Sequence, residues 1–139
     1  MIKKKITEKL DQYHGFHDSK VKQIYVESNH CIVGIVIDHA YDSVPSSAGE
    51  VVVSDEEGGA PKRYDILYRP MTVLFKDVVQ VRVKTEADPV NEEIVLSCQV
   101  AEDREEKALG ADVVHIEVLL TSLSRLDIFC RDFECKTSA

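Results

Sequence analysis

Hydrophobic positions recur at two different periods along the chain. In residues 3–13 they recur at helical spacing between Lys and Glu residues, and Gly15 ends the pattern, so a short helix is expected there. From Asp18 onward the period shortens and β-branched residues dominate. Residues 21–26 and 30–37 are two such runs joined by a polar turn, and they predict a hairpin whose second strand is central in a sheet.

Strand-like runs continue through the rest of the chain. Pro70 is expected to mark an edge or a bulge, because proline has no backbone N–H to donate to a ladder. Residues 38–63 are the least regular stretch, and their turn-forming residues predict a pair of surface loops around one short strand. The further strands are expected at residues 50–54, 64–68, 72–75, 79–84, 94–100, 113–120 and 125–130. The last two are expected to form a second hairpin, with polar alternation at His115, Glu117 and Asp127.

This pattern predicts a mainly β protein, at the margin of the α+β class. The expected architecture is an antiparallel β-sandwich or barrel-like sheet of about seven to nine strands with one short N-terminal helix. The length of 139 residues, the hydrophobic content of 44% and the charged content of 30% are those of an ordinary globular domain. We therefore expect residues 1–139 to form a single domain.

Charge and cysteine content limit the classes of partner and compartment. The formal net charge of -8 argues against binding to nucleic acid, which requires clustered Lys and Arg, and favours encounters with basic proteins. The N-terminus lacks the apolar region of a signal peptide, and the longest apolar run, residues 31–37, is too short to span a membrane. A cytoplasmic location is expected, with the four cysteines present as reduced, buried thiols.

One short segment contains residue types that could perform chemistry. His14, His17 and Asp18 would supply two imidazoles and a carboxylate to a metal ion if a turn brought them together, as in a metal-binding protein or a hydrolase. The alternative is that this segment is a corner between a helix and a strand, anchored in the core by Phe16. Four ligands complete a closed zinc site, and no second pair of ligands at matching spacing is present.

Other catalytic patterns are missing from the sequence. No serine or cysteine lies in a G-x-S-x-G turn, and the glycine-rich stretch at residues 58–62 lacks the spacing of a phosphate-binding loop. Adjacent glutamates, as at residues 56–57, 92–93 and 105–106, are typical of solvated loops. The sequence therefore predicts no catalytic residue and no cofactor, and it favours a non-enzymatic function.

Short segments along the chain resemble one protein family. The GFHDS sequence of residues 15–19, followed by an alternating strand, is similar to the FHDS opening of small bacterial immunity proteins of polymorphic toxin systems. Residues 73–81 look like the L-x-F-x-x-V strand pair of that family, and residues 126–130 resemble its closing hairpin. The resemblance implies a compact β-rich domain that binds and neutralises a cognate toxin made by the same cell.

The acidic loops are the expected contact surface for such a partner. Carboxylates would suit the Lys and Arg residues of a basic toxin domain such as a nuclease. A different possibility is a structural or assembly module, in which exposed strand edges form a homo-oligomer. The residues expected to bind a partner are Asp55, Glu56, Glu57, Glu102, Asp103, Glu105 and Glu106.

Overall fold

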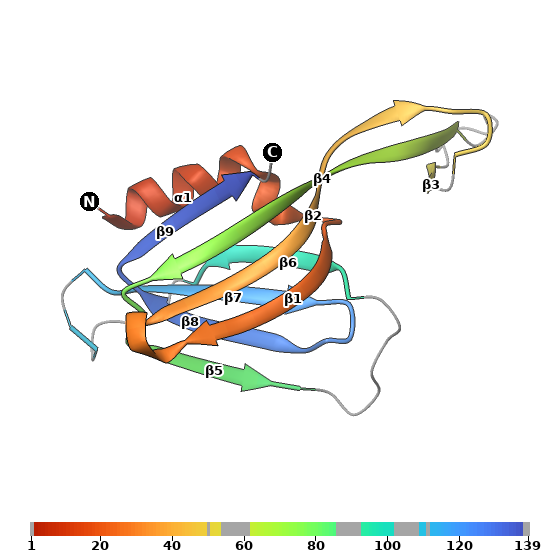
Figure 1. The fold of residues 1–139 in the computed structure, drawn as a ribbon. Helices are drawn as coiled ribbons and strands as arrows, with labels where there is room; N and C mark the ends of the chain where they lie inside the picture. Colours follow the sequence, from red (N-terminus) through yellow and green to blue (C-terminus); the bar gives the residue numbers. More distant parts are fainter. Residues whose placement is uncertain are drawn as a thin grey trace.

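The computed structural model describes the backbone of residues 2–49, 51–53, 62–85, 93–101, 109–110 and 112–137 (Figure 1). These residues include one α-helix, two 3₁₀ turns and nine strands. The helix is α1 (Ile2–Gln12), and the turns are η1 (His14–Phe16) and η2 (Ser28–His30). The strands are β1 (Lys20–Glu27), β2 (Ile32–Pro45), β3 (Val51–Val53), β4 (Lys62–Lys76), β5 (Gln80–Lys84), β6 (Val95–Val100), β7 (Val114–Leu120), β8 (Arg125–Cys130) and β9 (Asp132–Thr137).

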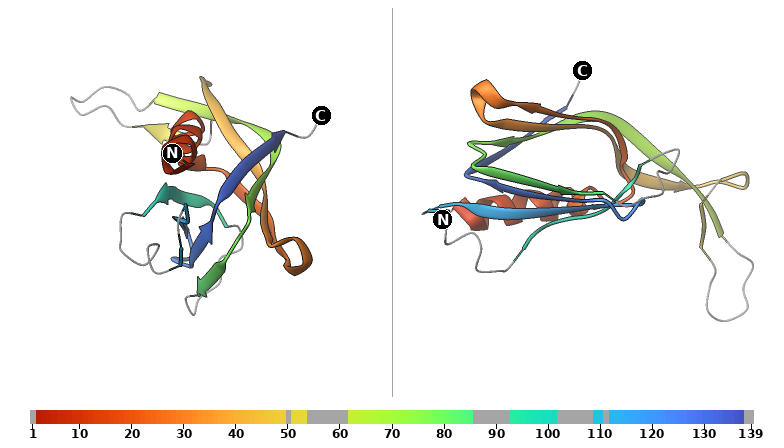
Figure 2. Two further views of the ribbon diagram at one scale, coloured as in Figure 1. Left: turned by 90° about the vertical axis from the view of Figure 1, so that its left-hand side faces the viewer. Right: turned by 90° about the horizontal axis from the view of Figure 1, so that it is seen from below.

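The strands form two antiparallel sheets, which confirms the predicted mainly β fold. In the first sheet β1, β2 and β4 are neighbours, and the other side of β4 pairs with β3 near its start and with β9 near its end. The second sheet has the order β5-β8-β7-β6. The two sheets lie face to face (Figures 1 and 2). Backbone hydrogen bonds between the segment before β1 and Val95 of β6 join the sheets at one corner.

The hydrophobic core lies between the inner faces of the two sheets. Period-two alternation explains it, because every second residue of a strand points to the same face. The core residues from the first sheet are Val33, Ile35, Ile37, Met71, Val73, Phe75 and Phe133. Those from the second are Val95, Cys98, Val114, Ile116, Val118, Leu120, Leu126, Ile128 and Cys130.

Helix α1 covers one end of this core, as the helical spacing of its apolar residues predicts. Ile6 and Leu10 are buried, and the helix contacts β6 of one sheet and β9 of the other. Lys9 Nζ donates a hydrogen bond to the backbone oxygen of Phe133 at 3.0 Å, which ties the helix to β9. No helix in the described ranges has the length and hydropathy needed to cross a membrane.

The predicted surface loops within residues 38–63 are wrong over residues 38–45. These residues continue β2, which pairs with β4 from Val33 opposite Phe75 to Pro45 opposite Tyr64. Their turn-forming types are overridden because a long partner strand supplies backbone hydrogen bonds along this length. The short strand predicted at residues 50–54 is confirmed by β3.

The break in the strand predicted at Pro70 is wrong, since β4 runs continuously through it, but Pro70 does lie at a local edge of the sheet, as expected. Pro70 pairs with Asp38 of β2, and it lies between the parts of β4 that pair with β3 and with β9. On the side of β4 that faces away from β2, Pro70 has no strand neighbour within the described residues. Its missing N–H therefore costs no ladder hydrogen bond on that side of β4.

The long strands β2 and β4 project beyond the two sheets as a two-stranded ribbon (Figures 1 and 2). We call this projection the arm and define it as residues 40–45 of β2, residues 62–69 of β4, and β3. The rest of the molecule is the body. Strand β9 was not among the predicted strands, and in the structure it returns the chain to the first sheet.

Candidate functional site

The corner between α1 and β1 has an unusual backbone. His14, Phe16 and Asp18 have φ angles of 53°, 56° and 65°, a left-handed region that side chains with a Cβ rarely adopt. Gly15 has φ 60°, and a Cβ added to it would lie 2.9 Å from the backbone oxygen of Cys98. Phe16 is buried, as expected for a core anchor, and its packing holds the turn in this conformation.

The side chains of this corner do not assemble into a metal centre. His17 Nδ1 donates a hydrogen bond to the backbone oxygen of Leu96 at 2.8 Å, and its Nε2 lies 3.5 Å from Asp18 Oδ1. Both side chains are more than half exposed. Within the described residues, no group of three His, Cys, Asp or Glu side chains could hold a metal ion, so His14 does not complete a site with this pair.

A groove of about 500 Å³ lies beside the corner, between α1, η1 and β6. His14 and His17 line it, whereas Asp18 does not. Its volume falls within the range of small-molecule sites, and its polar groups could hydrogen-bond a small polar ligand. The other polar side chains along it are Lys3, Thr7, Asp11, Ser97 and Gln99.

A serine and a histidine meet in the interior next to this corner. Ser19 Oγ lies 3.2 Å from His39 Nδ1 and accepts a hydrogen bond from the backbone N–H of Ala40 at 3.1 Å. Ser19 is 0% exposed, so its hydroxyl cannot reach a substrate in this conformation. Burial lowers the pKa of His39, and the charges of Arg69 and His14 act in the same direction. This pair therefore orders the start of β1 against β2.

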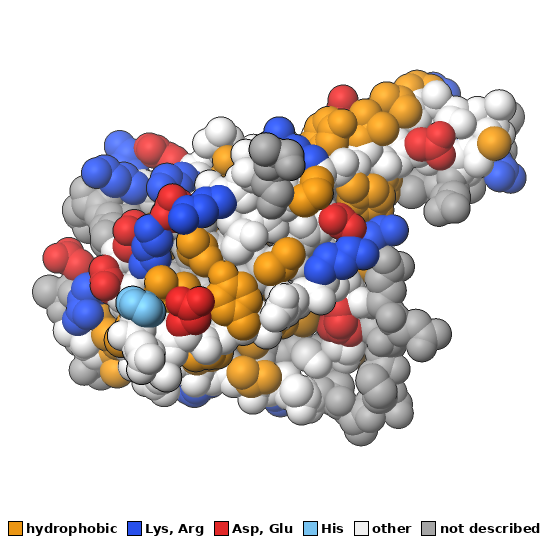
Figure 3. Space-filling model, viewed as in Figure 1, with side chains coloured by type: hydrophobic (Ala, Val, Ile, Leu, Met, Phe, Trp, Pro, Cys, Tyr) orange, Lys and Arg blue, Asp and Glu red, His pale blue; other side chains and the backbone are white. Residues whose placement is uncertain are grey.

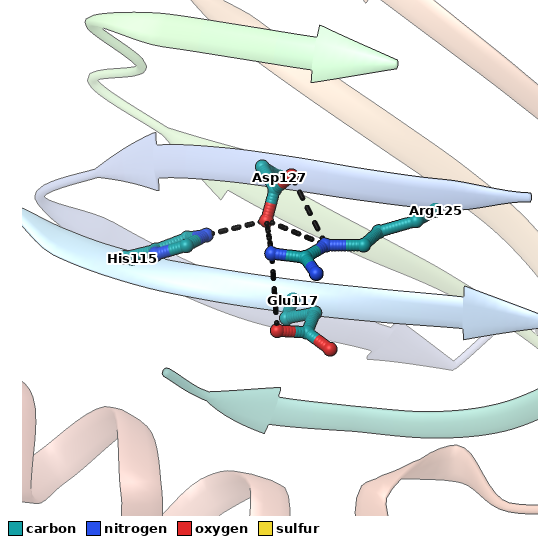
Figure 4. Close-up of polar contacts among 4 residues, drawn as sticks. All are labelled: His115, Glu117, Arg125 and Asp127. Carbon is teal, nitrogen blue, oxygen red and sulfur yellow. Dashed lines mark hydrogen bonds and ion pairs between the residues drawn. The ribbon is translucent and has the colours of Figure 1, made fainter. Parts of the chain in front are cut away.

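A polar network of four side chains lies on the outer face of the second sheet (Figure 4). His115 Nε2 donates to Asp127 Oδ1 at 2.6 Å, and both residues are buried. Arg125 binds the same carboxylate, through Nε at 3.2 Å to each oxygen and through Nη2 at 3.0 Å to Oδ1. Arg125 Nη2 also lies 3.4 Å from Glu117 Oε2. The network crosses from β7 to β8.

The electrostatics of this network favour an ionised Asp127. Burial acts to raise the pKa of this carboxyl group, but the hydrogen bonds from Arg125 and His115 outweigh it, and the pKa is lowered. The ring of His115 stacks on Phe129 with the centroids 4.3 Å apart. With both partners buried and engaged, the arrangement fixes the pairing of β7 and β8.

The sequence contained a signal for this network. Polar residues alternate through both strands of the predicted hairpin, and a hairpin register places Glu117 opposite Asp127. Finding the His115–Asp127 pair requires the register, because the two residues occupy different cross-strand positions.

The cysteines divide into two groups, and all four are free. Burial raises the pKa of Cys130 and of Cys135 to about 12, and it also raises the pKa of Cys98, which favours the protonated thiol at neutral pH. The prediction of buried thiols holds for Cys98 and Cys130, whereas Cys135 is only half-buried. The prediction is wrong for Cys31, which is exposed at the turn before β2.

The arm displays hydrophobic side chains to solvent. Tyr41 is 47% exposed, Val44 38% and Tyr68 36%. Figure 3 shows hydrophobic side chains along the projecting ribbon as well as on the body. The guanidinium of Arg69 lies over the Tyr41 ring at 5.3 Å, and Lys20 Nζ lies over the Tyr68 ring at 4.7 Å. Exposed aromatic rings beside cations are typical of protein-binding surfaces.

The acidic residues expected to bind a partner, at positions 55–57, 102, 103, 105 and 106, lie outside the described residues. By chain connectivity, residues 54–61 link β3 to the start of β4, and both of these strands belong to the arm. Comparison of the sequence with protein-family models and with curated proteins found no match.

Proposed function

We propose that this chain is a protein-binding domain that contacts its partner through the arm. The single observation that supports this most is the exposure of Tyr41, Val44 and Tyr68 on a two-stranded ribbon that projects from the body. Apart from the three residues of β4 that pair with β3, the arm is two-stranded, and a two-stranded ribbon gains little stability by itself in water. Keeping apolar side chains on it is therefore explained best by a surface that covers them in a complex.

Within this proposal, the partner is a toxin that the domain neutralises. The GFHDS sequence of residues 15–19 and the strand segments that follow it resemble immunity proteins of polymorphic toxin systems. The net charge of -8 favours association with a basic domain, because opposite net charges raise the rate of encounter. The body then acts as a rigid support that presents the arm.

The proposal is tested with the protein encoded by the gene next to this one. We expect expression of that protein alone to arrest growth, and co-expression with this domain to restore it. Calorimetry with the two purified proteins should then show a complex of defined stoichiometry. Normal growth with the neighbouring protein alone, together with no heat of binding, would contradict the toxin-neutralising function.

A further inference from the structure

Two strands end each sheet of the body, and three of these four edge strands are covered or charged. Helix α1 contacts β6 and β9, which are the edge strands on one side of the two sheets. The edge strands on the other side are β1 and β5 (Figures 1 and 2). Strand β5 carries Arg82 and Lys84, and cationic side chains on an edge disfavour pairing with another chain. In the described part of the chain, only the edge of β1 has neither form of protection.

The open part of this edge is residues 23–27 of β1, which we call the edge segment. No other described strand pairs with its outer side, and the segment contains no Lys, Arg or Pro. Ile24 and Val26 lie opposite core residues of β2 and therefore face the core side of the sheet, yet they are 39% and 63% exposed. The cation next to the segment, Lys22, is turned towards Asp38 of β2, with its Nζ 3.2 Å from Oδ2.

The edge segment is self-complementary. Two copies of it can pair antiparallel about a twofold axis at Tyr25, as in an isologous dimer. Ile24 of each copy then lies opposite Val26 of the other, so apolar side chains meet. Gln23 of each copy lies opposite Glu27, whose carboxylate can accept a hydrogen bond from the amide. Opposed positions are an even number of residues apart, so the backbone groups that point outward from one copy meet those of the other.

The Tyr25 ring leaves room for a second strand at this axis. Tyr25 lies opposite Gly34 of β2, and a Cβ added to Gly34 would clash with the Tyr25 ring. The ring is therefore directed across β2, over the space that the glycine leaves, and not over the free edge. Two copies of the edge segment can approach at Tyr25 without the rings lying between them.

We infer that two copies of this chain form a dimer through the edge segment, which joins their first sheets into one continuous antiparallel sheet. The inference goes beyond the proposed function and does not depend on it, since no residue of the edge segment belongs to the arm. A short segment makes a small contact, so the dimer is reversible. The net charge of -8 on each copy opposes the dimer, and salt strengthens it by screening this repulsion.

Sedimentation equilibrium of the full chain tests the dimer. From about 1 μM to about 1 mM protein, we expect the apparent mass to rise from the monomer mass of 15.6 kDa towards twice that value, and to rise at lower concentration in higher salt.

Two valines supply charge-matched variants for this measurement. Val26 on β1 and Val83 on β5 are 63% and 62% exposed, and both face the core side of an edge strand. Val26→Lys should weaken dimerisation by at least about tenfold, since a lysine that points inward from an edge strand blocks pairing. Val83→Lys should stay within about threefold of the wild type, because it lies outside the contact. Equal urea midpoints of the two variants would show that both fold.

A disulfide measures the register of the pairing. With the exposed Cys31 replaced by Ser, Tyr25→Cys should cross-link two copies when an oxidant is added, because the axis places residue 25 beside its own copy. Glu27→Cys in the same background should not cross-link, since its two copies lie about 13 Å apart along the strands and a disulfide spans less than about 7 Å.

Four results would overturn the inference. A wild type that stays monomeric over the whole range, at low and at high salt, would exclude the dimer and leave the proposed function intact. Equal dimerisation of the two valine variants would place the contact elsewhere. Cross-linking of Glu27→Cys as efficient as that of Tyr25→Cys would exclude the register. If Val26→Lys dimerised like the wild type but bound the protein of the neighbouring gene more weakly, that partner would be the occupant of the edge.

Discussion

The strands β2 and β4 pass through two environments, the body and the arm, with the same pairing partner in each. In the body, Ile35 and Val73 lie opposite each other and are buried against the second sheet. In the arm, Ser43 lies opposite Ile66 and Val44 opposite Asp65, and none of these four residues is buried. The backbone ladder is continuous, but the covering layer ends.

Hydrophobic residues therefore contribute differently to the core of the body and to the arm. At the core positions of the body they lose contact with water on folding, and this burial stabilises the fold by roughly 25 cal/mol per Å² of apolar surface. The body also has exposed hydrophobic residues outside the core, among them Val26, Val83 and Leu123. In the arm, Tyr41, Val44 and Tyr68 keep much of their contact with water, so they add less to stability. Their apolar surface stays available for a partner.

The largest expected effect contrasts two aromatic residues on β4. Phe75 is 0% exposed, and Phe75→Ala should destabilise the fold by about 3–5 kcal/mol, since it removes a large side chain and leaves a cavity. Tyr68→Ala on the arm should cost less than about 1 kcal/mol, mostly through its contact with Lys20. Urea unfolding measures both. A loss of stability from Tyr68→Ala as large as that from Phe75→Ala would show that the arm contributes to the core.

A smaller effect on stability is expected from replacing Asp127 in the body, compared with Asp65 in the arm. Asp127→Asn should cost about 1–3 kcal/mol, because it weakens buried hydrogen bonds with Arg125 and His115. The lowered pKa of Asp127 stabilises the wild type above the ordinary Asp pKa of about 3.9, and this contribution is lost as the pH falls through the folded-state pKa. The variant should therefore lose less stability over that acid range.

The matched control for this change is Asp65→Asn on the arm. Because Asp65 is exposed, Asp65→Asn should change the free energy of unfolding by no more than about 0.5 kcal/mol at any pH. Thermal unfolding of both variants from pH 3 to pH 7 provides the comparison. An Asp127→Asn variant with the same acid-range profile as the wild type would refute the assigned role of the network.

Backbone strain also distinguishes the two regions, since the positive φ angles of the described residues all lie in the body. Gly15→Ala should cost about 1–2 kcal/mol, because the added Cβ meets the backbone of Cys98 and alanine disfavours φ 60°. Chemical denaturation measures the loss. The matched arm variant Ser43→Ala should be nearly neutral, and a neutral Gly15→Ala would show that the corner relaxes freely.

The body could be predicted from the sequence more fully than the arm. The hairpins β1–β2 and β7–β8 follow from local alternation and short polar turns, and both were predicted correctly. Residues 43–45, Ser-Val-Pro, are turn-forming types, yet they extend β2 because residues 64–66 of β4 pair with them. Such pairing depends on residues about twenty positions away, which a local pattern does not contain.

The candidate site could likewise be predicted only in part, because its geometry depends on parts of the chain that a local pattern does not contain. The composition of the His14–Asp18 segment was visible in the sequence, but its left-handed turn was not, because three of the strained residues are not glycine. The exposure of Val44 follows from where the second sheet ends, which is a property of the whole fold. By contrast, the burial of Phe16 was predicted correctly, since an isolated aromatic residue between a helix and a strand is a natural core anchor.

The smallest expected effect concerns His39, which lies where the body meets the arm. It is buried, whereas Ala40 and Tyr41 beyond it belong to the arm. Because the folded-state pKa is lowered, the unfolded chain binds the extra proton more readily. The neutral ring therefore favours folding above the ordinary His pKa of about 6.5, and stability falls as the pH drops from there towards the folded-state pKa.

We expect His39→Gln to lose this pH dependence while retaining a polar group near Ser19. Thermal midpoints measured between pH 5 and pH 8 should fall towards acid for the wild type and stay flatter for the variant. His30→Gln is the control, since His30 is exposed in η2, and it should keep the wild-type slope. If the protection of the amides of residues 40–44 against exchange also falls towards pH 5 only when His39 is present, protonation at the junction loosens the arm before the body. Unchanged exchange would mean that the arm stays paired independently of His39.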